Sequence, residues 1–223
     1  MKLLALDTST AACTVAVLYG DALAERTELG TGHSERILEM VRDVLAEAGA
    51  ALSQLDAIAL GRGPGLFTGL RIGAGVAQGL AFGVDIPVVP VSSLAALAQG
   101  QGDAGVLAAF DARMHQVYFG AYRREANGIV TLVGSEQVAA PGAVAIPPDS
   151  DWVGAGSGWD QYHAELRARL GARVVEWRRG AHPHARDVAR LGAAAFKAGA
   201  SVAAEQALPV YLRDEVAVKP AKR

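Results

Sequence analysis

Two short segments combine the residue types that can hold a phosphate group. Asp7, Thr8 and Ser9 follow an apolar run with the pattern of a buried strand, and a second strand-like run, Trp152 to Ala155, leads into a glycine cluster that contains Gly154 and Gly156. Hydroxyls and backbone amides at such turns bind phosphate, and the Asp7 carboxylate could orient a metal-bound water. A polar turn without any ligand also explains these residues. The chain contains neither a complete dinucleotide-binding fingerprint nor a Gly-Lys-Ser/Thr phosphate loop.

A third segment, Gly61 to Gly73, places glycines before and inside a predicted helix. Each glycine in a helix interior costs about 0.5–1 kcal/mol relative to alanine. The segment follows the strand-like run Asp56 to Leu60. A strand, a flexible loop and a glycine-bearing helix in this order indicate that a phosphate or another helix approaches the backbone closely.

Other candidate groups have less specific patterns. His182, His184 and Asp187 could bind a metal ion, but Pro183 predicts a helix start, where a histidine and an aspartate are common. No Ser-His-Asp or Cys-His catalytic set is supported by the spacing of these residue types.

The single cysteine, Cys13, excludes an internal disulfide and favours a reducing compartment. Its surroundings, Ala-Ala-Cys-Thr-Val-Ala-Val, predict a small buried strand residue rather than a catalytic thiol. We expect Asp111 and Arg113 to form an ion pair that shapes a turn, and His115 to be an exposed strand residue.

The composition is that of an ordinary soluble globular protein with one large domain or two small ones. The 223 residues are 51% hydrophobic and 20% charged, with a formal net charge of −2. This charge argues against a protein that binds nucleic acid without a partner. We expect the basic residues Lys219, Lys222 and Arg223 to be solvated. The apolar run Leu3 to Leu6 ends at Asp7, so no secretory signal is predicted. With no membrane span apparent, we expect a cytoplasmic protein.

Apolar periodicity predicts two α/β units in succession. The first has the order β-β-β-α-β-α-β-α, which indicates a mixed sheet, and Gln99 to Asp103 marks the predicted boundary. The predicted strands are 1–6, 14–18, 22–28, 56–60, 88–91, 105–110, 116–122, 129–133 and 152–155. The predicted helices are 33–48, 68–82, one from 92, 160–170 and 184–199.

The predicted helix 68–82 is apolar over most of its circumference. A helix of this kind must be covered on more than one side. One side can pack on its own sheet, and the other side needs a second helix, either from this chain or from a partner. One stripe contains Gly69, Ile72, Gly73, Val76, Gly79 and Leu80, and three alanines lie on the far side.

Segments from both ends of the chain match the pattern of one family. They are Leu4-Ala-Leu-Asp7-Thr8-Ser9-Thr10, His33-Ser34, Gly63 to Gly73, Pro87 to Leu94, Asp111 to Met114 and Pro209 to Lys219. Together they resemble the TsaB (YeaZ) family, whose members are relatives of the tRNA-modification protein TsaD. Family members often carry serine where Leu66 stands and glutamate where Gln116 stands, and we expect neither difference to be disruptive.

The resemblance implies an α/β protein with an actin-like (ASKHA, ribonuclease H-like) fold. Two lobes would each contain a mixed β-sheet flanked by helices. The first lobe is expected to span residues 1–102 and to be completed by residues 204–223. The second is expected to span residues 103–203.

The resemblance also implies a role in forming N6-threonylcarbamoyladenosine at position 37 of tRNAs that read codons beginning with A. In that system TsaD transfers the threonylcarbamoyl group, and TsaB binds TsaD and TsaE. TsaD holds its metal through two histidines separated by three residues, and Ser93 and Leu97 stand at the corresponding positions here. The resemblance therefore implies a non-catalytic partner that needs no metal or cofactor and does not bind tRNA directly. It leaves open whether the isolated chain forms a homodimer.

For the sites, the resemblance implies weak ATP or ADP binding at Asp7, Thr8, Ser9, Gly154 and Gly156. It also implies that helices 33–48 and 68–82 form a bundle with TsaD or with a second copy. The expected interface residues are Ile37, Leu38, Val41, Leu45, Gly69, Ile72, Gly73, Val76 and Leu80. The alternative is an enzyme of the same fold, either an ATP-dependent phosphotransferase with Asp7 as general base or an M22-type metallopeptidase.

Overall fold

The computed structural model describes residues 1–20 and 22–213, which form two five-stranded sheets. In the first sheet the run Leu3 to Leu6 is completely buried, as expected for a strand covered on both faces. It belongs to β1, which pairs antiparallel with β2 and parallel with β4, in the order β3-β2-β1-β4-β5. The bounds are β1 Lys2–Asp7, β2 Ala12–Tyr19, β3 Ala22–Leu29, α1 His33–Glu47, β4 Ala57–Gly61, α2 Phe67–Val84, β5 Val88–Val91 and α3 Ser93–Gln101.

The second sheet has the same topology as the first. Its central strand β6 pairs antiparallel with β7 and parallel with β9, in the order β10-β9-β6-β7-β8. The sequence shows no fixed-period repeat, so the duplication is visible only in the strand order. The bounds are β6 Gly105–Asp111, β7 Val117–Arg124, β8 Val130–Ala139, β9 Trp152–Ala155, α4 Ser157–Leu170, β10 Val174–Arg178 and α5 Ala185–Lys197.

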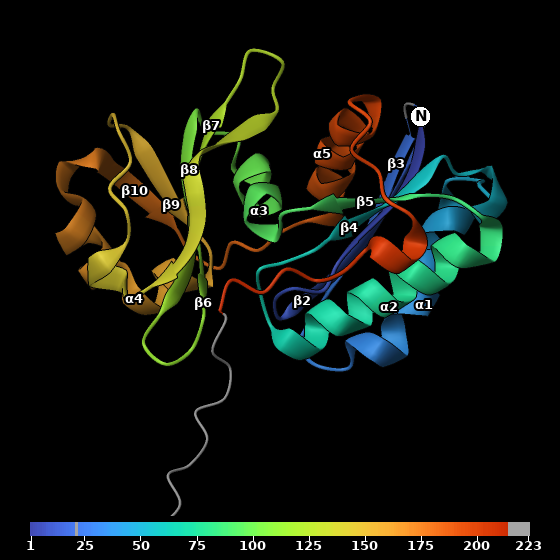
Figure 1. Cartoon of the computed structure of the whole chain (residues 1–223), viewed down its shortest axis with the longest axis horizontal. Coiled ribbons are helices and arrows are strands. Elements are labelled where there is room, and N and C mark those ends of the chain that lie inside the picture. Colours follow the sequence, from blue (N-terminus) through green and yellow to red (C-terminus); the bar gives the residue numbers. More distant parts are fainter. Residues whose placement is uncertain (21, 214–223) are drawn as a thin grey trace, which may run out of the picture.

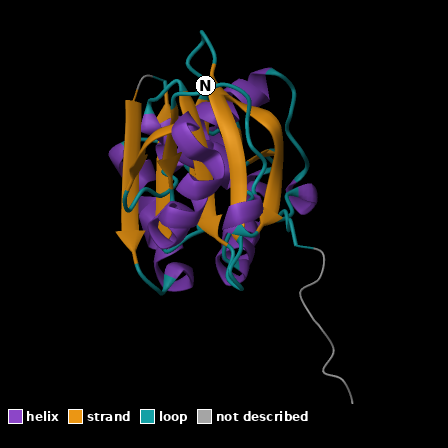
Figure 2. Cartoon of the chain, turned by 90° about the vertical axis from the view of Figure 1, so that its left-hand side faces the viewer, coloured by secondary structure: helices purple, strands orange, loops and turns teal. Residues whose placement is uncertain are grey.

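The helices and sheets form five layers (Figure 1). Helices α1 and α2 cover the outer face of the first sheet, and α4 covers the outer face of the second. Helices α3 and α5 lie between the sheets, in a central core that contains residues of both lobes. The view turned by 90° shows the strands running alongside one another with helices among them (Figure 2).

The two central helices cross over between the lobes. Helix α3 follows β5 of the first sheet but packs against β6 and β7 of the second. Helix α5 follows β10 of the second sheet but packs against β1, β2, β4 and β5 of the first. Gly192 allows this close approach, because a Cβ there would lie 2.6 Å from the Cβ of Ala59.

The predicted division into residues 1–102 and 103–203 separates α3 and α5 from the sheets that they cover. An amphipathic pattern tells that a helix is buried but not which sheet buries it, so the packing of α5 on the first sheet was not predicted. The chain also returns to the first lobe before residue 204, because Val202 forms a bridge with Val88. Residues 214–223 of the predicted returning segment lie outside the described residues.

One strand was missed and several bounds moved. Strand β10 was not predicted, because a bulge between Val174 and Glu176 interrupts the alternation of buried and exposed residues. Cys13 is buried in β2 as predicted, and burial raises the pKa of its thiol to about 11. Among the described helices, none is both long and apolar enough to span a bilayer.

Candidate functional site

The turn after β1 is a closed hydrogen-bonded unit. The Oδ1 of Asp7 accepts bonds from the backbone N–H of Ser9 (2.8 Å) and from its hydroxyl (2.6 Å). The Oδ2 accepts a bond from the hydroxyl of Ser93 at 2.6 Å. The Asp7 side chain has no exposed surface, and this burial raises the pKa of its carboxyl despite the three donors.

The glycines of α2 allow that helix to touch the turn. A Cβ at Gly69 would overlap the carbonyl oxygen of Thr8, and a Cβ at Gly73 would lie 2.5 Å from the Thr8 hydroxyl oxygen. The Thr8 hydroxyl donates to the carbonyl of Gly69 at 2.7 Å, and the N–H of Leu66 donates to the carbonyl of Ser9 at 2.7 Å. The close approach predicted from this segment is therefore made by the chain itself, at its own phosphate-type turn.

The second phosphate-type turn is filled by packing. The indole of Trp159 lies over Gly154, where a Cβ would be 2.5 Å from the ring. Its Nε1 donates to the carbonyl of Leu107 at 2.8 Å. A Cβ at Gly156 would overlap the carbonyl of Ala109. Gly154 and Gly156 are thus needed for helix α4 to pack on β6 and β9.

Four of the five residues of the predicted nucleotide site are closed off by packing in this structure, and nucleotide binding stays a prediction. Asp7, Thr8, Gly154 and Gly156 are buried and occupied by neighbouring groups of the chain, and Ser9 alone lines a cavity. Hydroxyls and glycines at a turn do not tell from sequence whether the turn is open or closed by a distant segment.

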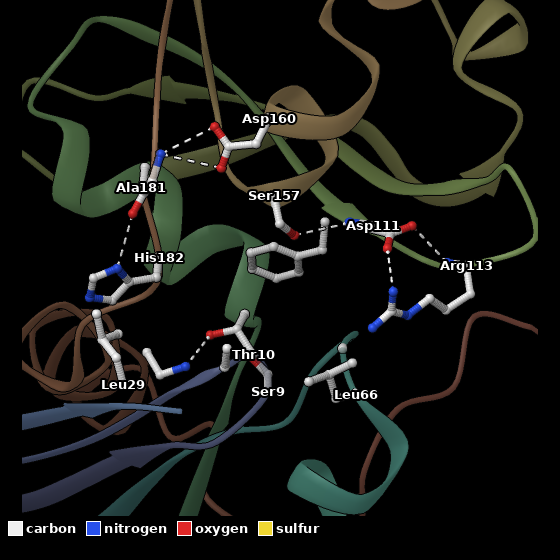
Figure 3. A pocket seen from close by; sticks show the side chains of 15 residues that line it. Ser9, Thr10, Leu29, Leu66, Asp111, Arg113, Ser157, Asp160, Ala181 and His182 are labelled. Atoms are coloured by element: carbon white, nitrogen blue, oxygen red, sulfur yellow. Dashed lines mark hydrogen bonds and ion pairs between the residues drawn. The ribbon is translucent and has the colours of Figure 1, made fainter. Parts of the chain in front are cut away.

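A cavity of about 290 Å³ does lie between the lobes, beside these turns (Figure 3). Its apolar wall comes from both lobes and includes Leu29, Leu66 and Phe110. Its polar groups contact one another: Ser157 accepts a bond from the Asp111 N–H, and the Asp160 carboxylate accepts one from Gly180. The polar lining residues are Ser9, Thr10, Asp111, Arg113, Ser157, Asp160 and His182.

The charges around the cavity do not favour a polyphosphate. The lining residues include two carboxylates, Asp111 and Asp160, but one guanidinium, that of Arg113, which lies 3.3 Å from Asp111. This pair confirms the predicted ion pair. His115 is exposed as predicted but lies in a left-handed turn rather than in a strand, and it pairs with Glu165 at 3.0 Å.

The outer surface of α2 presents a different arrangement from the predicted interface. Its small residues Gly69, Gly73, Ala74, Ala77 and Ala81 face the first sheet and are buried. The larger residues of the predicted stripe, Ile72, Val76 and Leu80, are therefore displaced to the flank and half-buried.

Four of the nine predicted interface residues are core residues. Ile37 and Val41 of α1 pack against the first sheet, and Gly69 and Gly73 face the turn after β1. Leu38 is 55% exposed, and Leu45 is half-buried like the three α2 residues.

Phe82, Gly75 and Gly83 open to solvent on α2 and were not part of the predicted stripe, whereas Gly79 was. Phe82 is 80% exposed, and a side chain at Gly75, Gly79 or Gly83 would meet nothing within 4 Å. The spacing of four residues between Gly75, Gly79 and Gly83 was the sequence signal that these positions share one face of the helix.

Comparison with known proteins places the chain in a family. A family model described as TsaD, tRNA N6-adenosine threonylcarbamoyltransferase, matches residues 27–220. The tRNA threonylcarbamoyladenosine biosynthesis protein TsaB of Escherichia coli K12 is 41% identical, over 98% of this chain and 97% of its own length. The chain belongs to the TsaB family.

Further relatives agree with this TsaB assignment. TsaB of Haemophilus influenzae is 40% identical over 98% of this chain and 96% of its own length. The structure of YeaZ from Pseudomonas aeruginosa superposes with a TM-score of 0.88 at 50% identity, covering 95% of this chain and 99% of that one. The actin-like, ribonuclease H-like fold expected from the sequence is confirmed.

At the two positions compared with the metal histidines of TsaD, this TsaB-family chain has core residues. Ser93 and Leu97 are both fully buried. The Ser93 hydroxyl donates to Asp7 and accepts a bond from the Gly63 N–H at 3.2 Å. Leu97 packs in the central core and cannot bind a metal ion.

The histidine pair that could have bound a metal lies next to α5. The rings of His182 and His184 are 4.6 Å apart, and His184 Nδ1 lies 3.6 Å from a carboxylate oxygen of Glu25. No cluster of three or more metal-ligand side chains occurs in residues 1–20 and 22–213. Instead Glu25 joins β3 to the start of α5, accepting bonds from the backbone N–H and the side chain of Arg186.

Proposed function

We propose that this chain is the non-catalytic partner subunit in the formation of N6-threonylcarbamoyladenosine at position 37 of tRNA. In this role it binds TsaD, together with TsaE, and supports the transfer that TsaD carries out. The family assignment supports the pathway, because the TsaB relatives are named for threonylcarbamoyladenosine biosynthesis.

The observation that carries the non-catalytic role is the closed network at Asp7. The carboxylate that a phosphotransferase would use as a base is sealed by Ser9 and Ser93. A peptidase of this fold would need a metal site, and the corresponding positions hold Ser93 and the apolar Leu97. This chain thus keeps the fold while using the reactive positions for packing.

The surface that supports partner binding is the solvent side of α2 with the adjoining part of α1. Exposed Phe82 and Leu38 supply apolar area, and the open Gly79 lets a second helix approach its backbone closely. TsaD is the proposed occupant in the assembly, and a second copy of this chain is the occupant when it is alone.

Gly79→Leu tests this surface. The added side chain enters open space, so the helix should gain up to about 1 kcal/mol of stability from losing a glycine. The same side chain should block a neighbouring helix and weaken binding to TsaD at least tenfold, measured by calorimetry, with less modified tRNA in a reconstituted reaction.

The matched control is Ala168→Leu, which adds a leucine to the exposed surface of α4 in the other lobe. It should leave TsaD binding unchanged. Unchanged binding by Gly79→Leu would overturn the assignment of this surface. Full activity of TsaD and TsaE without this chain would overturn the proposed function.

A further inference from the structure

Besides the solvent side of α2, a second surface of the chain contains arginine, aromatic and methionine side chains close together. We call it the C-terminal patch and define it by Phe67, Arg71, Met114, Tyr211 and Arg213. It lies where the segment after residue 208 runs from α2 toward the second lobe (Figure 1). It therefore joins the first turn of α2 to the loop between β6 and β7.

Within residues 1–20 and 22–213, Arg71 is held in place by aromatic side chains and not by an acidic partner. Its guanidinium carbon lies 3.7 Å from the centre of the Phe67 ring, and its Nε donates to the Tyr211 hydroxyl at 3.2 Å. The Phe67 and Tyr211 rings are themselves in contact, with centres 5.6 Å apart. A guanidinium fixed in this way loses little side-chain entropy when an anion binds.

Arg213 fixes the other half of the patch, again through neutral acceptors. Its Nη2 donates to the Ala112 carbonyl at 2.9 Å and to the Gln116 side chain at 2.5 Å. Its Nη1 lies 3.5 Å from the sulfur of Met114. Among the residues that the structure describes, no carboxylate is within ion-pair distance of Arg71 or Arg213.

The loop that Arg213 holds has a strained backbone. Arg113, Met114 and His115 have φ values of 60°, 53° and 57°, which non-glycine residues rarely adopt. In this loop Met114 is 80% exposed. Backbone strain that presents a large apolar side chain to solvent is typical of a binding surface.

The end of α2 adds to the positive charge of the patch. This helix of 18 residues has no acidic residue in its first turn and no side-chain cap. The positive end of its dipole is thus not compensated by an acidic side chain of its own first turn, beside Phe67 and Arg71.

We infer that the C-terminal patch binds an acidic segment of a protein partner, with a carboxylate on Arg71 and an apolar side chain against Met114 and Tyr211. Arginine, aromatic residues and methionine are the types enriched in protein interfaces. A protein segment is favoured over RNA because much of the patch is apolar and the chain as a whole carries a net charge of −2. The inference rests on the proposed function, which supplies the partner subunits.

The test is charge reversal by Arg71→Glu in the full chain, with TsaD and TsaE from the same organism as probes. We expect affinity for one of them, alone or in the assembled complex, to fall at least tenfold, because a carboxylate would then face a carboxylate. Tyr211→Phe, which removes only the hydroxyl that holds Arg71, should cause a smaller loss of about two- to fivefold. The salt dependence of binding should decrease in Arg71→Glu, because an ion pair is lost.

The matched control is Arg173→Glu, a charge reversal at an exposed position after α4. It should bind like the unmodified chain, and thermal melting should show that all three variants are folded. Restored binding by a glutamate-to-arginine change in the partner would identify the carboxylate and support the inference.

Three results would overturn the inference alone, and a fourth would also remove the proposed function. Affinities of Arg71→Glu equal to those of the unmodified chain would exclude the patch, whereas failure of the unmodified chain to bind either probe would remove the proposed function as well. Loss of tRNA binding by the assembled complex with intact protein association would assign the patch to RNA. Tighter binding after deletion of residues 214–223 would make this segment the occupant.

Discussion

Asp7 shows how a reactive-looking residue becomes structural. Its carboxylate accepts bonds from Ser9, two residues away, and from Ser93, 86 residues away. The first contact could be predicted from the sequence, since Asp-x-Ser turns bond locally. The second depends on the crossing of the chain, so the sequence could not show that this turn is closed. Cys13 needed no distant partner, and its burial was predicted from its neighbours alone.

Asp7→Asn tests the state of this carboxyl. Because burial raises the pKa of Asp7, the folded chain binds its proton more tightly than the unfolded chain does, whose pKa is about 3.9. The Asp7 contribution to the free energy of unfolding is therefore largest at low pH and is lost as pH rises through the folded pKa.

The asparagine cannot titrate, and its amide nitrogen cannot accept the bond from Ser93, which should cost roughly 1 kcal/mol at pH 7. We expect this destabilisation to grow when urea unfolding is repeated at pH 4.5. A destabilisation that shrinks at pH 4.5 would mean that the three hydrogen bonds lower the pKa of Asp7 more than burial raises it.

At the scale of elements, periodicity predicted nearly every helix and strand but not which side of a helix is covered. In α2 the large residues Ile72, Val76 and Leu80 were expected to mark the contact surface. The three alanines on the far side face the sheet, and Gly69 and Gly73 of the stripe face it too, because small residues let the helix axis come close to β1 and β4. For β10, the bulge after Val174 removed the pattern on which a strand prediction depends.

Two glycines of α2 provide a matched pair of substitutions. Gly73 lies against Thr8, where a Cβ would be 2.5 Å from the hydroxyl oxygen, whereas Gly75 faces open space. Gly75→Ala should raise the free energy of unfolding by about 0.5–1 kcal/mol, from helix propensity alone. Gly73→Ala should lower it by about 1–3 kcal/mol, because α2 or Thr8 must move.

Thermal or urea unfolding of both variants under identical conditions measures the difference. Equal stabilisation by the two alanines would show that α2 does not rest on the turn after β1. It would also reopen the question of what approaches the Gly61 to Gly73 segment.

At the scale of the molecule, the two lobes are similar in topology but not independent. The chain division predicted from Gln99 to Asp103 lies at a real boundary between the sheets, yet it separates α3 and α5 from the sheets that they cover. The central core contains both helices and residues from β1, β5 and β6. The lobes should therefore fold together rather than one at a time.

A fragment of residues 1–102 tests this dependence. It would lack α5, which covers the inner face of the first sheet and contributes Val188 and Leu191 to the central core. Uncovering Leu3, Val89 and Val91 would lose roughly 5–9 kcal/mol, at about 1.5–3 kcal/mol for each side chain. This is comparable to the whole stability of a typical domain, about 5–15 kcal/mol. We expect the fragment to melt without a cooperative transition in circular dichroism, and coexpression with residues 103–223 to restore one. A cooperative transition of the fragment alone would mean that the first sheet is stable without the crossing helix, and that the lobes are separate folding units.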